Sequence, residues 1–454
     1  MLGYYLLMHA VIVLFGAGEA MIRLPSLLAD ALTAALVSAL ALRLFAERRI
    51  ALSAGALTAV SLPLVFWGQD ARGYSLMAAF GAAAFLALAA ILQAPAGQRP
   101  SRRAVFAYGL TTLAAIYIGF DAILLTAAQL FLVLACFRSR LRVVLGTLVA
   151  VAVLCVPLLV MALNRGSGQL FWVPKLGGPV LGQAALTLSS AGLPPNFHET
   201  ATSAAAAVLT GVLLIAAVVA AVRCRRPYSS SWQSQPLLLP LAWLAVPAVL
   251  SLLAALAGMP IELSRAAILL IPALALTLSW ALTHPSLPRG AGLAAIVLVL
   301  TLRLLQLVPS YGISPEGWRA ASNYVLTAVR SGPACVAFYP EDGRMPFDYY
   351  VRRAPSEAAN LAPVLPVAPW SQVRPYVERY VSLGDTGQRA GITGHCARLW
   401  LIASHQGQRD GPLTSRRDYA RYRRVLAELR SAYGAPTLRS FGYAAAVRVY
   451  LFGR

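Results

Sequence analysis

The stretch GEAMIRLPS at residues 18–26 opens an apolar hairpin that closes with GQDARGY at residues 68–74. Between these charged clusters lie two apolar runs, LLADALTAALVSALALRLF (27–45) and ALSAGALTAVSLPLVFW (51–67), each long enough to cross a bilayer. A chain that crosses the membrane and returns brings both clusters to one face. Because ionisable residues at a membrane boundary are a default functional-site hypothesis, we expect the chemistry at these two clusters.

Composition assigns the chain to a class. Hydrophobic residues make up 59% of the 454 residues, charged residues only 12%, and the mean hydropathy is +0.67. This composition predicts a polytopic α-helical membrane protein rather than a soluble globular one. The net charge of +21 lies mainly in short loops between apolar runs, so it indicates membrane topology and not nucleic-acid binding.

About ten apolar runs are predicted to cross the membrane. They cover residues 27–45, 51–67, 74–92, 104–118, 120–137, 143–163, 203–222, 236–257, 265–283 and 291–308. Alternate loops carry the arginine-rich groups Arg43/Arg48/Arg49, Arg99/Arg102/Arg103, Arg138/Arg140/Arg142, Arg223/Arg225/Arg226 and Arg289. The positive-inside rule assigns these loops to the cytoplasm of a multi-pass plasma-membrane protein and both opening clusters to the outer face.

After residue 310 the composition changes to alternating amphipathic and strand-like segments. The predicted helices and strands cover residues 315–331, 334–340, 398–404, 415–434 and 441–452. Residues 311–454 are therefore predicted to form a small extracytoplasmic α/β domain, which we interpret as a lid or an acceptor-recognition module. Its arginines do not conflict with the topology, because long translocated domains escape the positive-inside rule.

The five cysteines divide by their predicted location. Cys136, Cys155 and Cys224 fall in spans or at the cytoplasmic edge and are predicted to be free thiols. Cys335 and Cys396 fall in the outer domain, where an oxidising compartment favours a disulfide between them. The alternative is a pair of buried, unpaired cysteines.

Motifs in the N-terminal part carry a family resemblance. They are YYLLMH (residues 4–9), LFGAGE (14–19), RLPSLLA (23–29) and QDARGYSL (69–76). In this order they resemble the N-terminal half of bacterial GT-C glycosyltransferases, the protein O-mannosyltransferase and aminoarabinose-transferase relatives that include the actinobacterial mannosyltransferase type. Further along, PIELSR (260–265) resembles the family's late Pro…Arg-Tyr motif, with Ala266 at the tyrosine position.

The resemblance implies a transferase that moves a sugar, mannose by family analogy, from a polyprenyl-phosphate donor to a glycan, lipid or protein acceptor on the outer face. In this family the principal catalytic carboxylate lies in the first outer loop, before the Tyr-Tyr-Leu-Leu-x-His motif. The chain starts at that motif. We therefore expect an N-terminally truncated chain, whose residues 1–310 form a GT-C-like transmembrane domain without the first helix, the first loop and the catalytic base upstream of Met1.

The remaining charged residues fit the handling of a lipid-linked phosphate. Arg72 and Arg265, both predicted near the outer interface, are candidates to hold the phosphate by charge-assisted hydrogen bonds, and Lys175 is a third. Asp70 and Glu19 are candidates to orient Arg72 or to bind a divalent cation such as Mg²⁺ or Mn²⁺, for which carboxylate oxygens are suitable ligands. The alternatives are a snorkelling Arg265 and a plain loop cation at Lys175.

Tyr74 and His9 complete the predicted substrate-binding set, and each has a structural alternative. Tyr74 is equally consistent with an aromatic belt residue, and His9 with a packing role. Glu19 and Arg23 are four residues apart, so they are also predicted to pair on one helical turn. Asp121 lies in an outer turn, where a turn-forming role competes with contact to the acceptor.

Two other functions stay open at this stage. A transporter of lipid-linked glycans is disfavoured, because the sequence shows no inverted repeat and its charges gather at one face. A catalytically inactive relative that binds lipid-linked sugar is the stronger alternative, since the family's catalytic carboxylate has no counterpart in the sequence. Membrane lipids are partners in every case.

Overall fold

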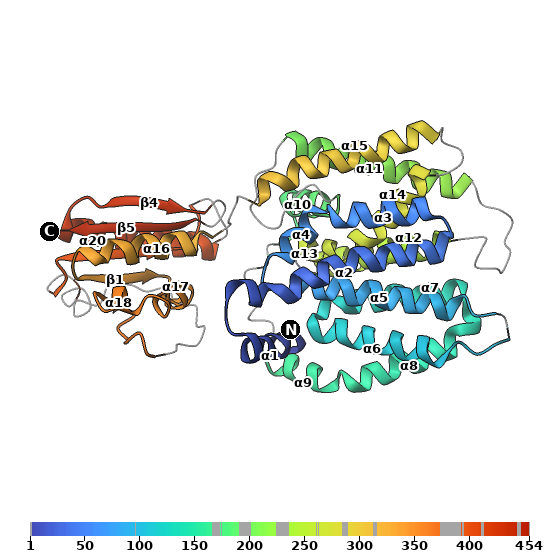
Figure 1. Ribbon diagram of the computed structural model, residues 1–454, viewed down its shortest axis with the longest axis horizontal. Helices are drawn as coiled ribbons and strands as arrows, with labels where there is room; N and C mark the ends of the chain where they lie inside the picture. The colour runs from blue at the N-terminus through green and yellow to red at the C-terminus, as the bar shows by residue number, and fades with distance from the viewer. Residues whose placement is uncertain are drawn as a thin grey trace. The chain divides into compact units, whose positions relative to one another are not determined.

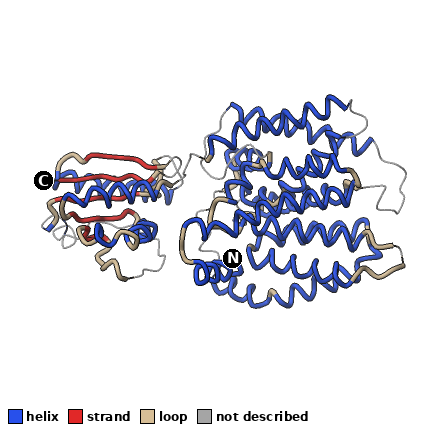
Figure 2. The backbone as a smooth tube through the Cα atoms, viewed as in Figure 1, coloured by secondary structure: helices blue, strands red, loops and turns tan. Residues whose placement is uncertain are grey.

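A computed structural model describes residues 2–95, 97–165, 173, 175–189, 201–223, 236–259, 261, 263–283, 289–311, 316–372, 392, 395–409, 413–442 and 446–453. The chain divides into two compact units, Met1–Ser310 and Tyr311–Arg454, which are coloured along the chain in Figure 1. The described elements of the first unit are helices, and every described strand lies in the second unit (Figure 2). The protein is thus a mostly helical membrane protein with a small C-terminal sheet domain.

The helices of the first unit follow the apolar runs of the sequence. They are α1 (Leu2–Phe15), α2 (Glu19–Phe45), α3 (Arg48–Ala59), α4 (Leu62–Gly68), α5 (Tyr74–Leu92), α6 (Arg102–Ile118), η1 (Phe120–Ala122), α7 (Ile123–Cys136), η2 (Arg138–Arg140), α8 (Leu141–Leu154), α9 (Val156–Arg165), α10 (Gly178–Leu188), α11 (Ala201–Arg223), α12 (Leu238–Leu256), α13 (Leu263–Ile268), α14 (Ile271–Thr283) and α15 (Arg289–Ser310). Each of the ten predicted runs is helical, as one helix or as successive helices. In Figure 1, α11 and α15 run side by side, as do α6 and α8.

Four helices in the described part of the chain are long and apolar enough to cross a membrane by themselves. They are α2, α5, α12 and the Gly290–Val308 part of α15. Two bent pairs, α3 with α4 and η1–α7 with η2–α8, bring the number to six if each pair is one span. The number of ten spans stays a prediction.

The predicted continuous runs 51–67 and 265–283 are among those that are broken in the structure. The first divides into α3 and α4, whose axes differ by 58°, and Pro63 lies in the first turn of α4. The second divides into α13 and α14, with Pro272 in the first turn of α14. Proline has no N–H to donate to the carbonyl four residues earlier, so it is accepted at the start of a helix and ends the one before.

The core of the helical unit is built around α5, which packs between α2 and α6. Buried small residues of α5 such as Ala78 and Ala82 allow close approach of the neighbouring helices, the usual packing device in membranes. Further along α5, the ring of Phe85 stacks on Trp243 of α12, with centroids 3.9 Å apart. The Trp243 indole donates to the Leu269 carbonyl at 3.0 Å, which satisfies an oxygen at the α13–α14 break.

The second unit contains a five-stranded sheet in the order β2-β1-β3-β5-β4. Its strands are β1 (Ala334–Tyr339), β2 (Leu361–Leu365), β3 (Arg398–Ala403), β4 (Thr437–Phe441) and β5 (Val447–Gly453). β1 is parallel to β2 and β3, whereas β5 is antiparallel to β3 and β4. The predicted strand 441–452 is wrong in its extent, because residue 441 ends β4 and β5 begins at Val447. β2 was not predicted.

Helices cover both faces of this sheet. They are α16 (Trp318–Ala328), α17 (Arg344–Val351), α18 (Pro355–Ala358) and α20 (Leu413–Tyr433). Successive residues of a strand point to opposite faces, so Leu399 and Leu401 of β3 pack with α20, and Trp400 and Ile402 pack with α16 and α17. The two apolar cores agree with the α/β character expected from the sequence.

Cys335 on β1 and Cys396, two residues before β3, are joined by a disulfide. Their Cα atoms are 5.8 Å apart, and 61 positions separate them in sequence. Cys136 and Cys155 of the helical unit are free thiols, as expected. Cys224 lies outside the described residues.

Candidate functional site

The turn between α4 and α5 carries the first candidate residues. In this turn the Arg72 Nε lies 3.8 Å from the Asp70 Oδ2, and both side chains are about half exposed. The Ser26 hydroxyl of α2 donates to the Arg72 carbonyl at 3.0 Å. The charged clusters 18–26 and 68–74 therefore meet in the folded chain, as the hairpin predicts.

Glycines at both ends of this turn allow it to lie close to its neighbours. A Cβ atom at Gly68 would come within 3.1 Å of the Asp30 carboxylate on α2. At Gly73 it would come within 2.9 Å of Ile118 on α6 and 3.5 Å of Tyr4 on α1. The pattern G-Q-D-A-R-G thus supplies two exposed charged side chains on a backbone held between three helices.

Arg265 of α13 joins the turn from a distant part of the sequence. Its Nη1 donates to the Tyr74 hydroxyl at 2.7 Å, across 191 positions. Its guanidinium carbon lies 5.7 Å from the centroid of the Trp67 ring and 5.5 Å from that of Tyr74. Cations are attracted to aromatic faces at such distances. Arg265 is therefore fixed by one hydrogen bond and two rings, and is not a freely snorkelling side chain.

Asp121 adds a carboxylate to the same end of the helices. It lies in the 3₁₀ turn η1 and interacts electrostatically with Arg265. The turn reaches this position through Gly119, where a Cβ atom would come within 2.7 Å of the Met77 sulfur on α5. We refer to Trp67, Tyr74, Asp121 and Arg265 as the Arg265 cluster. A cation beside two adjacent aromatic rings, with a carboxylate near by, is suited to bind an anionic group next to an apolar or sugar moiety.

The whole fold has solved counterparts. ArnT from Cupriavidus metallidurans matches in its apo state with a TM-score of 0.56 at 13% identity, over 99% of this chain and 87% of ArnT. The same protein bound to undecaprenyl phosphate matches with a TM-score of 0.55 at 13% identity, over 98% of this chain and 87% of ArnT. The chain has the fold of ArnT. An oligosaccharyltransferase from Archaeoglobus fulgidus is more distant, with a TM-score of 0.43 at 11% identity, over 98% of this chain and 65% of that one.

Neither a family model nor a curated protein matches the sequence. The structural likeness therefore assigns the fold alone, and the chemistry has to be argued from the side chains. Within this fold the strongest convergence of candidate residues is the Arg265 cluster with the adjacent turn.

Glu19 lies close to Arg23, as its predicted structural role requires. Its carboxylate lies 3.9 Å from the Arg23 guanidinium, one helical turn away on α2. Across the described residues, no three histidine, cysteine, aspartate or glutamate side chains come together as a metal site. Binding of a divalent cation by Asp70 and Glu19 stays a prediction.

Two other predicted residues, His9 and Lys175, form no hydrogen bond or ion pair with the Arg265 cluster. His9 is exposed on α1 and Lys175 is exposed before α10, and neither has a hydrogen bond or ion pair with another described residue. Pro260 and Glu262 of the late motif lie outside the described residues. The predicted donor-binding roles of His9 and Lys175 stay predictions.

Trp67 has no role in the sequence-based prediction, and Asp121 has two competing roles there. The predicted span 51–67 ends at Trp67, which directly precedes the charged turn. A recognisable signal for this kind of site combines three features. They are an aromatic residue next to such a turn, a second one at Tyr74, and an arginine in a late motif. Asp121 had only its turn position as a signal.

Proposed function

We propose that the protein is a membrane glycosyltransferase that moves a sugar, mannose by the family resemblance, from a polyprenyl-phosphate donor to a cell-envelope acceptor. The observation that carries the proposal is the Arg265 cluster at one end of the helices of a GT-C fold. The ArnT structure with bound undecaprenyl phosphate supports a lipid phosphate as the donor's carrier group.

Arg265 is proposed to bind the donor phosphate. When the sugar leaves, the bridging oxygen gains negative charge, and a pre-oriented guanidinium stabilises that charge in the transition state. Tyr74 and Trp67 hold the guanidinium in place before the donor arrives. Asp121 places a carboxyl group within electrostatic reach of the same guanidinium.

Arg72 and Asp70 are proposed to act at the edge of the same site. Both are half exposed on a turn that Ser26 anchors to α2, so they are accessible to a donor or an acceptor. Transfer also needs a carboxylate to take the proton of the acceptor hydroxyl, a role to which no residue of this sequence is assigned. We assign Arg72 to the phosphate and Asp70 to the orientation of Arg72, with Asp70 and Glu19 as ligands if a divalent cation takes part.

We assign the cluster to the outer face of the plasma membrane, together with the C-terminal domain, because the arginine-rich loops favour the cytoplasm for the opposite helix ends. The lipid tail of the donor requires apolar helix surface close to the cluster. Exposed apolar side chains of α1, such as Leu6 and Leu7, provide such a surface close to Tyr4, which lies against the turn. Such residues allow a long polyprenyl tail to pack against the protein in place of membrane lipid.

Transfer from labelled polyprenyl-phosphate-mannose by the full chain in liposomes tests the proposal. The Arg265→Gln variant removes the charge and is expected to lower the transfer rate by about 100-fold or more, the usual effect of losing one transition-state donor. Arg102→Gln, an exposed arginine at the start of α6, is the matched control and should keep the wild-type rate.

Binding and transport measurements on the same liposomes separate the other two functions. Polyprenyl-phosphate binding without any transfer, from every sugar tried, would identify an inactive lipid-binding relative. Movement of the intact donor between leaflets would identify a transporter. Either result contradicts the transferase proposal, and so does an Arg265→Gln variant with wild-type transfer.

A further inference from the structure

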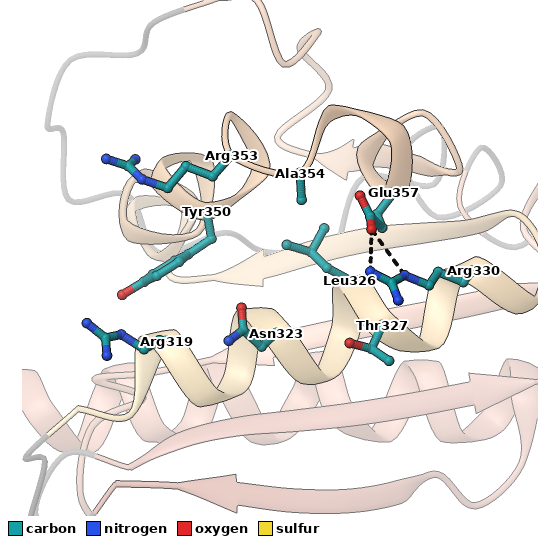
Figure 3. Close-up of a pocket in the computed structure, with 9 residues that line it drawn as sticks. All are labelled: Arg319, Asn323, Leu326, Thr327, Arg330, Tyr350, Arg353, Ala354 and Glu357. Carbon is teal, nitrogen blue, oxygen red and sulfur yellow. Dashed lines mark hydrogen bonds and ion pairs between the residues drawn. The ribbon is translucent and has the colours of Figure 1, made fainter. Parts of the chain in front are cut away.

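A pocket of about 290 Å³ lies in the C-terminal domain between α16 and the segment that contains α17 and α18. Figure 3 shows the side chains that line it. We call it the α16 pocket and define it by Arg319, Asn323, Thr327, Arg330, Tyr350 and Glu357. It belongs to the second unit alone and has no part in the Arg265 cluster.

One wall is a polar row on α16 and the turn after it. Arg319, Asn323, Thr327 and Arg330 follow one another at spacings of four, four and three residues, which puts them on one helix face. The opposite face of α16 is buried in the core against the sheet. The sheet thus holds α16 by its apolar face. The polar row lies on the other face and takes no part in packing the core.

An ordered ion pair closes one end of the pocket. The Arg330 Nε donates to the Glu357 Oε1 at 3.1 Å, and the Ser356 hydroxyl donates to the other carboxylate oxygen at 2.6 Å. These hydrogen bonds from Ser356 and Arg330 lower the pKa of Glu357 to about 2. At neutral pH the pair therefore offers a fixed carboxylate acceptor beside guanidinium donors, a combination that binds hydroxyl groups well.

The other end carries a cation and an aromatic wall. In Figure 3, Tyr350 lies across the pocket from Arg319 and Asn323, and the apolar Leu326 is on the floor between the walls. The Arg353 guanidinium turns away and lies over the Tyr349 ring, 3.6 Å from its centroid. Arg319 is thus the guanidinium at this end that faces the Tyr350 side of the pocket.

We propose that the α16 pocket binds an acidic saccharide, a pyranose ring that carries a carboxylate or a phosphate. The ring packs on Tyr350, its hydroxyls bond to Asn323 and to the Arg330–Glu357 pair, and its anionic group binds Arg319. The volume is close to the lower limit of about 300 Å³ for small-ligand pockets, which suits one or two sugar rings. The proposal concerns binding alone and does not depend on the transferase activity.

Calorimetric titration of the full chain in nanodiscs of zwitterionic phosphatidylcholine tests the proposal. The probes are a uronic-acid oligosaccharide, mannose 6-phosphate, a neutral mannose oligosaccharide and inorganic phosphate. We expect at least one of the two acidic sugars to bind at least tenfold more tightly than the neutral sugar and phosphate, and to bind more weakly as salt is raised. The two acidic probes distinguish a carboxylated glycan from a sugar phosphate.

Variants locate the binding in the α16 pocket. Arg319→Gln should weaken binding of the acidic sugar about tenfold or more, and Tyr350→Ala should do the same by removing the aromatic wall. Arg352→Gln changes an exposed arginine outside the pocket and is the matched control, expected within twofold of wild type. Thermal unfolding of each variant identifies any that fail to fold, and Tyr350→Phe, which keeps the ring, should then retain binding.

Several results would overturn the proposal. These are no binding of either acidic sugar, equal binding of the neutral sugar, and equal binding of inorganic phosphate. Wild-type affinity in Arg319→Gln would also contradict it. Binding to vesicles with anionic phosphatidylglycerol, with none to the acidic sugars, would assign the pocket to lipid headgroups instead.

Discussion

Arg303 of the helical unit and Arg344 of the C-terminal domain are both almost completely buried, and they are satisfied differently. Arg344 is 1% exposed; its Nε lies 3.3 Å from the Asp348 carboxylate and its Nη1 donates to the Ala368 carbonyl at 2.8 Å. Arg303 is 2% exposed and its Nη1 donates to the Leu57 carbonyl, whereas its Nε has no hydrogen-bond partner in the described part of the chain. One guanidinium is neutralised by a carboxylate and the other is bonded to backbone.

The difference follows from what each arginine stabilises. Arg344 connects α17 to the 366–369 loop, and its charge is balanced within the domain. Arg303 lies where the α3–α4 break leaves carbonyl oxygens near a helix C-terminus, which attracts a cation. The comparison teaches that the buried Arg344 of the sheet domain forms part of an ion pair, while the buried Arg303 of the helical unit caps a broken helix.

Replacement of Arg344 is the strongest test of the difference between the two buried arginines. In Arg344→Met the Asp348 carboxylate is left buried without its cation, so we expect a loss of about 3–5 kcal/mol in the free energy of unfolding of the domain. Chemical unfolding of the full chain, followed by hydrogen exchange on β1 and β3, measures it. Arg344→Met combined with Asp348→Leu should regain much of the loss, and a single-variant loss below about 1 kcal/mol would contradict the role of the pair.

The disulfide is a second feature that distinguishes the C-terminal domain from the helical unit. Cys335→Ser with Cys396→Ser removes a link across 61 positions, and we expect the C-terminal domain to lose about 2–4 kcal/mol of stability. Cys136→Ser, at a free thiol of the helical unit, is the control and should change little. Thermal unfolding with and without reductant provides the measurement; equal effects of reductant on wild type and the double variant would contradict the expectation.

Replacement of Arg303 should have a smaller effect than replacement of Arg344. Arg303→Met loses one hydrogen bond to backbone but also removes a buried charge from apolar surroundings, so the two contributions oppose each other. We expect a change of about 1 kcal/mol or less in unfolding free energy, measured as for Arg344→Met. A loss as large as that of Arg344→Met would mean that the two arginines are equivalent.

The smallest expected effect is the pH dependence of the exposed Arg330–Glu357 pair. The pKa of Glu357 is lowered from 4.5 to about 2 in the folded state by its hydrogen bonds to Ser356 and Arg330. Its contribution to stability is therefore present above the unfolded-state pKa and is lost as the pH falls from about 4.5 to about 2. Unfolding curves of wild type and Glu357→Gln should converge over this range, and a constant difference between them would contradict the assignment.

Much of the helical unit could be predicted because helix formation in a membrane depends on a local property, the length of an apolar run. The predicted run 74–92 coincides with α5. The strand β2 was missed because its sequence LAPVL contains Pro363, which removes a backbone donor and argues against a central strand. The sheet order explains why Pro363 is tolerated in β2, because β2 is an edge strand and one of its sides needs no hydrogen-bond partner.

The candidate site could be predicted only in part. Asp70, Arg72 and Tyr74 were selected from one short motif, and they do lie on one turn. The contact of Arg265 with Tyr74 spans 191 positions, and the electrostatic influence of Arg265 on Asp121 depends on how α6, α7 and α13 pack. No pattern within a helical period contains that information. The α16 pocket likewise could not be predicted from the sequence, because its two walls come from separate segments, α16 and the segment with α17 and α18.

The sequence by itself determined the membrane class, the helical runs and the change to an α/β domain after residue 310, because apolar length, periodicity and charge distribution are properties of neighbouring residues. Only the tertiary structure decided that the cation at Arg265 lies against Trp67 and Tyr74, and that the polar row of α16 faces Tyr350 and Glu357. Such contacts depend on the packing of distant helices, which shape and close approach of side chains decide and which the local sequence pattern does not specify.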